Sequence, residues 1–172
     1  MELTSGNIRL RGFRKSDSKK IAALANNENI SKNLRDFFPS PYSENDAEVF
    51  ILLCQAEDPQ VAFIIEYRGE PAGCISLVIQ KDIYKKSAEI GYWIGEPFWG
   101  KGIATEAVKL VVEYGFDHLE LVRIFTGVFD FNKASQKVLE KAGFYLECIS
   151  KKSVYKSGRI LDEYKYAKIK DK

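Results

Sequence analysis

The chain has 172 residues, which is enough for one domain with a full hydrophobic core. Its apolar fraction of 45% and charged fraction of 29% are ordinary for a soluble globular protein. The formal charge of +2 comes from basic residues scattered among acidic ones, which argues against a nucleic-acid partner. We therefore expect a single domain over residues 1–172.

Membrane insertion, disulfides and metal binding are also disfavoured. No apolar run approaches the roughly 20 residues that span a bilayer, and the opening MELTSGNIRL lacks the apolar core of a signal peptide. The cysteines, Cys54, Cys74 and Cys148, are odd in number and form no Cys-x-x-Cys pair, and His118 is the only histidine. We expect no metal site, no membrane partner and a reducing, cytoplasmic location.

The first third of the chain predicts a strand, a helix, a loop and a second helix. Residues 8–13 alternate apolar and basic side chains, as a half-buried strand does. Apolar spacing predicts a helix over 17–26, with Asp17 as its N-cap. Two prolines interrupt residues 35–42, which read as a loop. Ser43 then begins a capping-box pattern before a helix over 47–56.

The remainder alternates strands and helices. Three β-rich runs separated by short turns predict an antiparallel meander, and two amphipathic helices follow, the second ending before Gly143. Lys156-Ser157-Gly158 is a hairpin signal between two terminal strands. The order predicts a mixed α/β (α+β) domain with a largely antiparallel sheet. The expected strands cover 61–67, 72–80, 87–95, 123–129, 144–155 and 159–169, and the helices cover 104–116 and 132–142.

A glycine-rich segment separates the third meander strand from its helix and is typical of a phosphate-binding loop. A Walker A motif is excluded because Gly102 stands where its hydroxyl residue should be, and a dinucleotide fingerprint would need glycine at Thr105. The shorter pattern x-x-Gly-x-Gly/Ala before a helix fits Trp99 to Ala104. Gly100 and Gly102 would let main-chain amides approach an anion at the helix start. A glycine-rich turn without a ligand is the alternative.

Three segments together resemble one family. They are SAEIGYWIGEPFWGKGIATEA (87–107), FNKASQKVLEKAGF (131–144) and IRLRGFRKSDSKKIAAL (8–24). They resemble GNAT N-acetyltransferases, and specifically the ribosomal-protein-alanine N-acetyltransferase branch. The resemblance extends over nearly the whole chain, and two motifs at the expected separation are more specific than either alone.

The resemblance implies a three-layer GNAT fold with helices on both faces of a sheet that splays open at the cofactor. It also implies acetyl-CoA as cosubstrate, with main-chain amides of the glycine loop around the pyrophosphate. The strand before the loop would pair with the pantetheine arm, and Asn132 would hydrogen-bond it. The expected cofactor residues are Trp93, Ile94, Trp99, Gly100, Lys101, Gly102, Ile103, Ala104, Thr105 and Asn132.

Two residues are the candidate catalysts. Glu89 lies on the strand before the loop and would act as a base through water, or would only position the amine or pair with a basic side chain. The family's usual tyrosine acid is replaced by Leu139, which leaves Ser135 to protonate the leaving thiolate. Asn132 and Ser135 also fit an N-cap and a first-turn residue, and both pairs of roles can coexist. The branch's second glutamate is replaced by Val154.

The amine acceptor is the part of the function that the sequence determines least. Candidate acceptor residues are Asp36, Phe37, Phe38, Tyr155 and Tyr164. An α-amine is roughly a tenth neutral at pH 7 and needs less help from a base than a lysine, which fits a protein N-terminus. A polyamine or other small amine is the alternative acceptor, and a non-catalytic acetyl-CoA sensor is the alternative function. A homodimer through the terminal strands is expected only at the level of the family.

Overall fold

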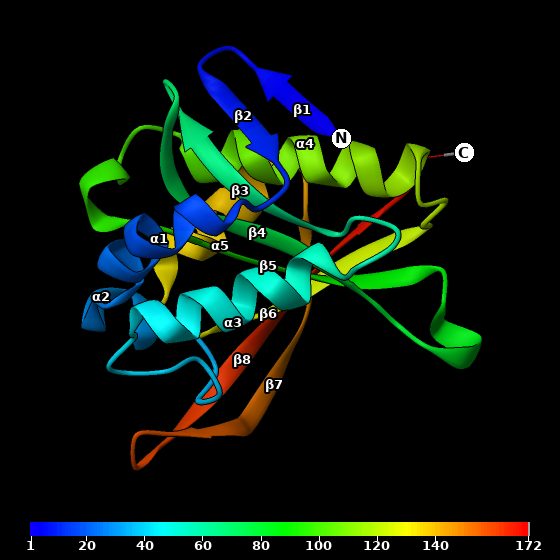
Figure 1. Cartoon of the computed structure of the whole chain (residues 1–172). Helices are drawn as coiled ribbons and strands as arrows, with labels where there is room; N and C mark the ends of the chain where they lie inside the picture. Colours follow the sequence, from blue (N-terminus) through cyan, green and yellow to red (C-terminus); the bar gives the residue numbers. More distant parts are fainter. Residues whose placement is uncertain (172) are drawn as a thin grey trace. The chain divides into compact units, whose positions relative to one another are not determined.

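The computed structural model describes residues 1–171, which form two compact units. Unit 1 comprises Met1–Ser76 and Tyr92–Val111, and unit 2 comprises Leu77–Gly91 and Val112–Lys172. The strands hydrogen-bond in the order β1-β2-β3-β4-β5-β6-β8-β7, a mixed open sheet (Figure 1). Strands β4 (Glu70–Ile79) and β5 (Ser87–Ile94) and helix α4 (Ile103–Asp117) each run through both units.

The strands of unit 1 form an antiparallel array. β1 (Glu2–Ser5) pairs with β2 (Ile8–Arg11), which pairs with β3 (Ala62–Tyr67), which pairs with β4. The predicted first strand is confirmed but ends at Arg11, two residues early. β1 was not predicted, because four residues carry too short an alternation to be recognised without their partner strand. The inner strand β3 is buried on both faces, as expected in a three-layer fold.

The helices of unit 1 begin and end close to the predicted limits. The 3-10 turn η1 (Lys15–Asp17) leads into α1 (Ser18–Ala25), α2 (Glu28–Ser31) follows, and α3 covers Glu44–Gln55. Ser43 and Asp46 form the predicted capping box, so α3 starts three residues before the expected Ala47. Asp17 precedes α1, but its side chain makes no capping bond. Asp17 thus occupies the predicted N-cap position, but its carboxylate binds Arg11 and not the first amides of α1.

The core of unit 1 lies between two helices and the sheet. Figure 1 shows α1 (blue) and α3 (cyan) side by side. Their inward side chains pack with those of β3 and β4, and the cluster also takes in Phe13 and Tyr42. Its other buried members are Ile21, Ala22, Ala25, Ala47, Ile51, Cys54, Ala62, Ile64 and Cys74.

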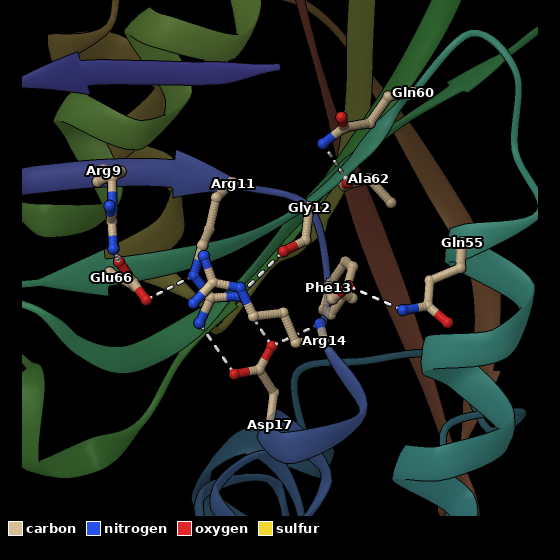
Figure 2. A network of polar contacts seen from close by, with 10 residues as sticks. All are labelled: Arg9, Arg11, Gly12, Phe13, Arg14, Asp17, Gln55, Gln60, Ala62 and Glu66. Atoms are coloured by element: carbon tan, nitrogen blue, oxygen red, sulfur yellow. Dashed lines mark hydrogen bonds and ion pairs between the residues drawn. The ribbon is translucent and has the colours of Figure 1, made fainter.

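A buried ionic network joins β2, β3 and the start of α1 (Figure 2). Arg11 donates from both terminal nitrogens to the Asp17 carboxylate, at 2.9 Å each, and from Nε to Glu66 at 2.5 Å. Arg9 donates to the other Glu66 oxygen at 2.7 Å. Only 4% of Arg11, 5% of Asp17 and 3% of Glu66 is exposed. Every charge in the network has an opposite partner, which burial requires.

Unit 2 contains a long terminal hairpin beside a strand and a helix. β6 (Arg123–Phe129) pairs antiparallel with β8 (Arg159–Ile169), which pairs with β7 (Tyr145–Lys156). Positive φ angles at Ser157 (50°) and Gly158 (75°) form the two-residue turn that the sequence predicted. The limits predicted for β6 and β8 match the structure. Helix α5 spans Lys133–Lys141 and is followed by Gly143 at φ 86°, the predicted C-terminal glycine.

Strands β5 and β6 pair over only part of their lengths. Their parallel register joins Ser87–Glu89 to Arg123–Phe125. β6 continues to Phe129 while paired with β8 on its other side. The described β5–β6 register therefore consists of three pairs and stops at Glu89 and Phe125, and the splay of the sheet stays a prediction. Two 3-10 turns complete the elements, η2 (Asp82–Tyr84) and η3 (Glu96–Phe98). Within residues 1–171, no helix has the length and apolar character needed to cross a bilayer.

Breaking the ionic network should destabilise unit 1. In Asp17→Asn, buried Arg11 keeps only Glu66 as a charged partner, and we expect a loss of about 3 kcal/mol in urea unfolding. Glu70→Gln is the control, since its pair with Lys20 is long, at 3.8 Å, and exposed, and should cost about 0.5 kcal/mol or less. Equal losses in the two variants would contradict the assignment.

The same variant has a predicted pH dependence. Burial raises the pKa of Asp17, but hydrogen bonds from Arg11 and the Arg14 amide outweigh it and leave the pKa below the ordinary value of 3.8. A carboxylate with a depressed folded pKa stabilises the protein above its unfolded pKa. The stability difference between wild type and Asp17→Asn should therefore be complete at neutral pH and shrink as the pH falls below about 4. A difference that persists unchanged at pH 2 would contradict this.

Candidate functional site

The glycine loop of unit 1 presents bare backbone at the start of α4. Gly100 and Gly102 adopt φ angles of 75° and 74°, a region that side chains disfavour. A β-carbon built on either glycine would meet no atom within 4 Å, so the space in front of the loop is open. The first amides of a helix have no partner within the helix. The stretch Gly100-Lys101-Gly102 therefore forms an amide-lined entrance to α4, at which neither glycine presents a side chain.

The loop is fastened to the end of β5. Trp99 donates its indole Nε1–H to the carbonyl oxygen of Ile94 at 2.7 Å, and Gly95 N–H donates to Ala72 O at 2.8 Å. Trp99 was expected to contact the cofactor, and here its indole fixes the loop to the strand. The Ile94 carbonyl keeps one lone pair for a second donor.

Lys101 is held between aromatic rings. Its ammonium lies 5.3 Å from the Phe98 ring centroid and 5.8 Å from that of Tyr67, and donates to Pro97 O at 3.0 Å. Cation–π contacts of this kind are worth about 0.5–1 kcal/mol at exposed sites. A positive charge is thus kept beside the amide-lined entrance.

Glu96 anchors the other side of the loop, a role that the sequence did not reveal. Its carboxylate accepts hydrogen bonds from Asn27 Nδ2 at 2.6 Å and Asn29 Nδ2 at 3.3 Å. These bonds, from Asn27 first, lower the pKa of Glu96 and keep it ionised. The contacts span more than sixty residues of sequence, so no local pattern could have indicated them.

Trp93 links the cofactor strand to one acceptor candidate. Its ring packs edge-on against Phe38 at 6.4 Å between centroids. Its backbone approaches Gly73 so closely that a β-carbon there would overlap the Trp93 carbonyl oxygen. Of the neighbouring candidates, Asp36 is exposed and Phe37 is 82% exposed. Phe38 therefore packs, whereas Phe37 is available to a partner.

In unit 2, two of the predicted site residues meet at the start of α5. Asn132 caps the helix, with its side-chain oxygen accepting from Ser135 N–H at 3.1 Å. This confirms the N-cap role. Tyr164 lies nearby, because the Lys133 ammonium stands 4.9 Å from its ring centroid. Tyr164 thus faces α5.

The other two candidates of unit 2 lie apart from α5. Glu89 pairs with Phe125 at the last position of the β5–β6 register and is half-buried. Tyr155 is 74% exposed and stands opposite Ile160, next to the hairpin turn. The glycine loop, Trp93 and the 36–38 segment belong to unit 1, and Glu89, Asn132, Ser135, Tyr155 and Tyr164 belong to unit 2. Among residues 1–171, no group of three or more His, Cys, Asp or Glu side chains is arranged to hold a metal ion.

Comparison with known proteins connects these features to a family. Residues 7–145 match the model of the acetyltransferase (GNAT) domain. Spermidine N(1)-acetyltransferase of Escherichia coli strain K12 is 30% identical over 81% of this chain and 74% of its own length. A protein of Bacillus subtilis named "Probable N-acetyltransferase YjcK" is 51% identical over a shorter match, which covers 42% of this chain and only 40% of that relative.

A solved structure supports the fold. RimL, described as a ribosomal L7/L12 alpha-N-protein acetyltransferase in complex with coenzyme A, superimposes with a TM-score of 0.86 over 98% of both chains at 23% identity. At that identity the likeness establishes the fold alone. The family match covers most of the chain, and GNAT enzymes use acetyl-CoA. The chain belongs to the GNAT family of N-acetyltransferases.

Proposed function

We propose that this enzyme transfers the acetyl group of acetyl-CoA to the α-amine of a protein N-terminus, and that both units belong to one N-acetyltransferase domain over residues 1–172. The observation that carries the choice of acceptor is the charge of the β7–β8 hairpin. Residues 145–169 contain six basic and three acidic residues, whereas the whole chain has 26 and 24. The excess positive charge of the protein is concentrated there.

The acidic residues of the hairpin are already paired. Asp162 binds Lys151, and Glu163 binds Lys165. Glu147 forms a two-point pair with Arg123 of β6. At the turn, Lys156 and Arg159 stand directly opposite each other, which places two basic residues side by side. Such a surface repels a polycation and attracts a peptide with acidic side chains.

The glycine loop fits the diphosphate of acetyl-CoA. Gly100 and Gly102 leave the space in front of the α4 amides open, and the nearby Lys101 ammonium opposes the negative charge. The proposed cofactor residues are Trp93, Ile94, Asn132 and the loop from Trp99 to Thr105, with Trp99 acting through its bond to Ile94. Bound acetyl-CoA supplies the thioester, and the protein holds and orients it.

Glu89 and Ser135 are the proposed catalytic side chains. Glu89 would hold the acceptor amine, and Ser135 would donate its hydroxyl proton toward the departing thiolate. The Asn132 cap, which fixes the first turn of α5 that carries Ser135, supports this role. Holding the two substrates in register supplies much of the acceleration, because an α-amine near neutral pH needs little activation.

A small-amine acceptor is the second candidate. The observation in its favour is the match to spermidine N(1)-acetyltransferase over 81% of this chain. The two candidate acceptors carry opposite charge, since the peptide has acidic side chains and spermidine is a polycation. Activity measured over a panel of acceptors therefore separates them.

The acceptor prediction concerns charge. Peptides with acidic residues after the N-terminal residue should have higher kcat/KM than neutral peptides, and spermidine the lowest. Reversing two hairpin charges in Lys152→Glu with Arg159→Glu should lower kcat/KM for the acidic peptide by about tenfold and reduce its sensitivity to salt. Lys19→Glu with Lys20→Glu, the same change on the exposed surface of α1, is the control. Spermidine as the best substrate of the wild type would overturn the proposed acceptor.

The loop prediction concerns acetyl-CoA affinity. Gly102→Ala places a side chain at a φ of 74°, in the opening that the cofactor needs, and should weaken binding at least tenfold by calorimetry. Gly6→Ala is a matched control, because Gly6 has a φ of 54° and equally open space but lies in the β1–β2 turn. Both variants should lose about 1–2 kcal/mol of stability. Equal acetyl-CoA affinity in the two variants would contradict the proposed loop function.

The Ser135 prediction concerns turnover. Ser135→Ala should lower kcat by about tenfold to a hundredfold, which is at the low end of what a general acid contributes to a rate. The affinity for acetyl-CoA should stay within twofold of wild type. Ser5→Ala on β1 should leave both values unchanged. An unaltered kcat in Ser135→Ala would remove Ser135 from the proposed mechanism.

A further inference from the structure

A second carboxylate lies on the same face of the sheet as Glu89. In unit 2, the register places Glu89 opposite Phe125, and Glu163 opposite Phe129. Paired residues project to the same face, and so do residues two apart along β6. Glu89, Gly127 and Glu163 therefore share one face. The residues of the opposite face meet the helices, since Ile124 lies against α4 at Gly115, and Tyr166 bonds Glu140 of α5.

The Glu163 carboxylate lies directly over Gly127. A β-carbon built on Gly127 would overlap Glu163 Oε1 and the carboxyl carbon, and would stand 3.0 Å from Cγ. A glycine inside a strand weakens it and often marks a close approach of another group. Here the missing side chain makes room for the carboxylate. The Glu163 side chain is only 14% exposed. Strand geometry puts Gly127 roughly 8 Å from Glu89, between α-carbons.

The position lies on the part of β6 that β5 no longer covers. Gly127 is two residues beyond Phe125, the last residue in the β5–β6 register. The Lys165 ammonium forms an ion pair with the Glu163 carboxylate. Glu163 is therefore a carboxylate with a cation already beside it, on the face that carries Glu89. Besides Lys165, the charged or titratable side chains that the register puts on this face are Arg123 on β6, Tyr145, Cys148 and Lys156 on β7, and Arg159 on β8.

We infer that Glu163 binds the ammonium of the acceptor and takes its proton. This rests on the proposed transfer to a primary amine. One proton passes from the ammonium nitrogen to a Glu163 carboxylate oxygen, which leaves a neutral amine with a lone pair. The amine nitrogen then bonds to the acetyl carbon as the carbon–sulfur bond breaks and the electron pair leaves on sulfur. The second nitrogen proton reaches the thiolate through Ser135, and Glu163 returns its proton to water. Glu89 is then left with positioning the amine.

The test compares two independent disruptions of the same carboxylate. Glu163→Gln removes its basicity, and Gly127→Ala displaces it without requiring a positive φ. Both should lower kcat/KM for an N-terminal peptide by about tenfold to a hundredfold at pH 7. The deficit should narrow toward wild type by pH 9, where the peptide α-amine is already neutral. Glu120→Gln, an exposed carboxylate of unit 2 that is ion-paired with Lys86 outside the hairpin, should match wild type throughout.

The outcomes separate this inference from the proposed acceptor. Acetyl-CoA affinity, measured by calorimetry, should be the same in every variant. The inference is overturned if Glu163→Gln and Gly127→Ala keep kcat/KM within twofold of wild type at pH 7. It is also overturned if their loss of kcat/KM is the same at pH 6 and at pH 9. If the wild type acetylates spermidine but no peptide, the N-terminal acceptor fails. The same variants are then assayed with spermidine as the acceptor. Their loss of kcat/KM should persist through pH 9, because alkyl ammonium groups titrate near 10.

Discussion

The site depends on the backbone amides at the start of a helix, which are preceded by two glycines in a left-handed conformation. Gly100 and Gly102 supply that conformation without side chains, and α4 begins directly after them. An anion bound there is stabilised by dipoles that are already aligned, so little reorganisation is required. The surrounding contacts serve to keep this arrangement in place. Trp99 ties the loop to the end of β5, and Glu96 ties it to the segment after α1.

Unit 1 is stiffened at a second point, where charge rather than apolar contact fixes the geometry. The pairing of Arg11 with Asp17 and Glu66 fixes the start of α1 to β2 and β3. Burying charge is expensive, and the network gains specificity because each arginine fits only one arrangement of carboxylates. Asn27 and Asn29, which hold Glu96, lie at the start of α2, the next helix after α1. The glycine loop is therefore supported by the segment that follows α1, a helix whose own origin is fixed by buried ions.

Unit 2 contains the charged residues on which the proposed acceptor and the proposed base depend. Its hairpin concentrates the positive charge of the chain at an exposed turn, while its carboxylates are held in ion pairs. The face of β6 that carries Gly127 places Glu163 where a side chain would otherwise lie. An acceptor with an ammonium group and nearby acidic side chains meets both features. In the proposed mechanism, the positive charge of the hairpin would recognise the acidic side chains near the amine, and Glu163 would act on the amine itself.

The sequence by itself determined the features that depend on local patterns. Gly100 and Gly102, the Ser43 capping box, the Asn132 cap and the hairpin turn follow from residues close together in the chain, and each is present as predicted. Tertiary structure alone decided which partners distant side chains found. Asp17 became an ion-pair partner of Arg11 and not a cap, Trp99 bonded a carbonyl, and Glu163 filled the space over Gly127. The register between strands decides such contacts, and neither propensity nor periodicity encodes it.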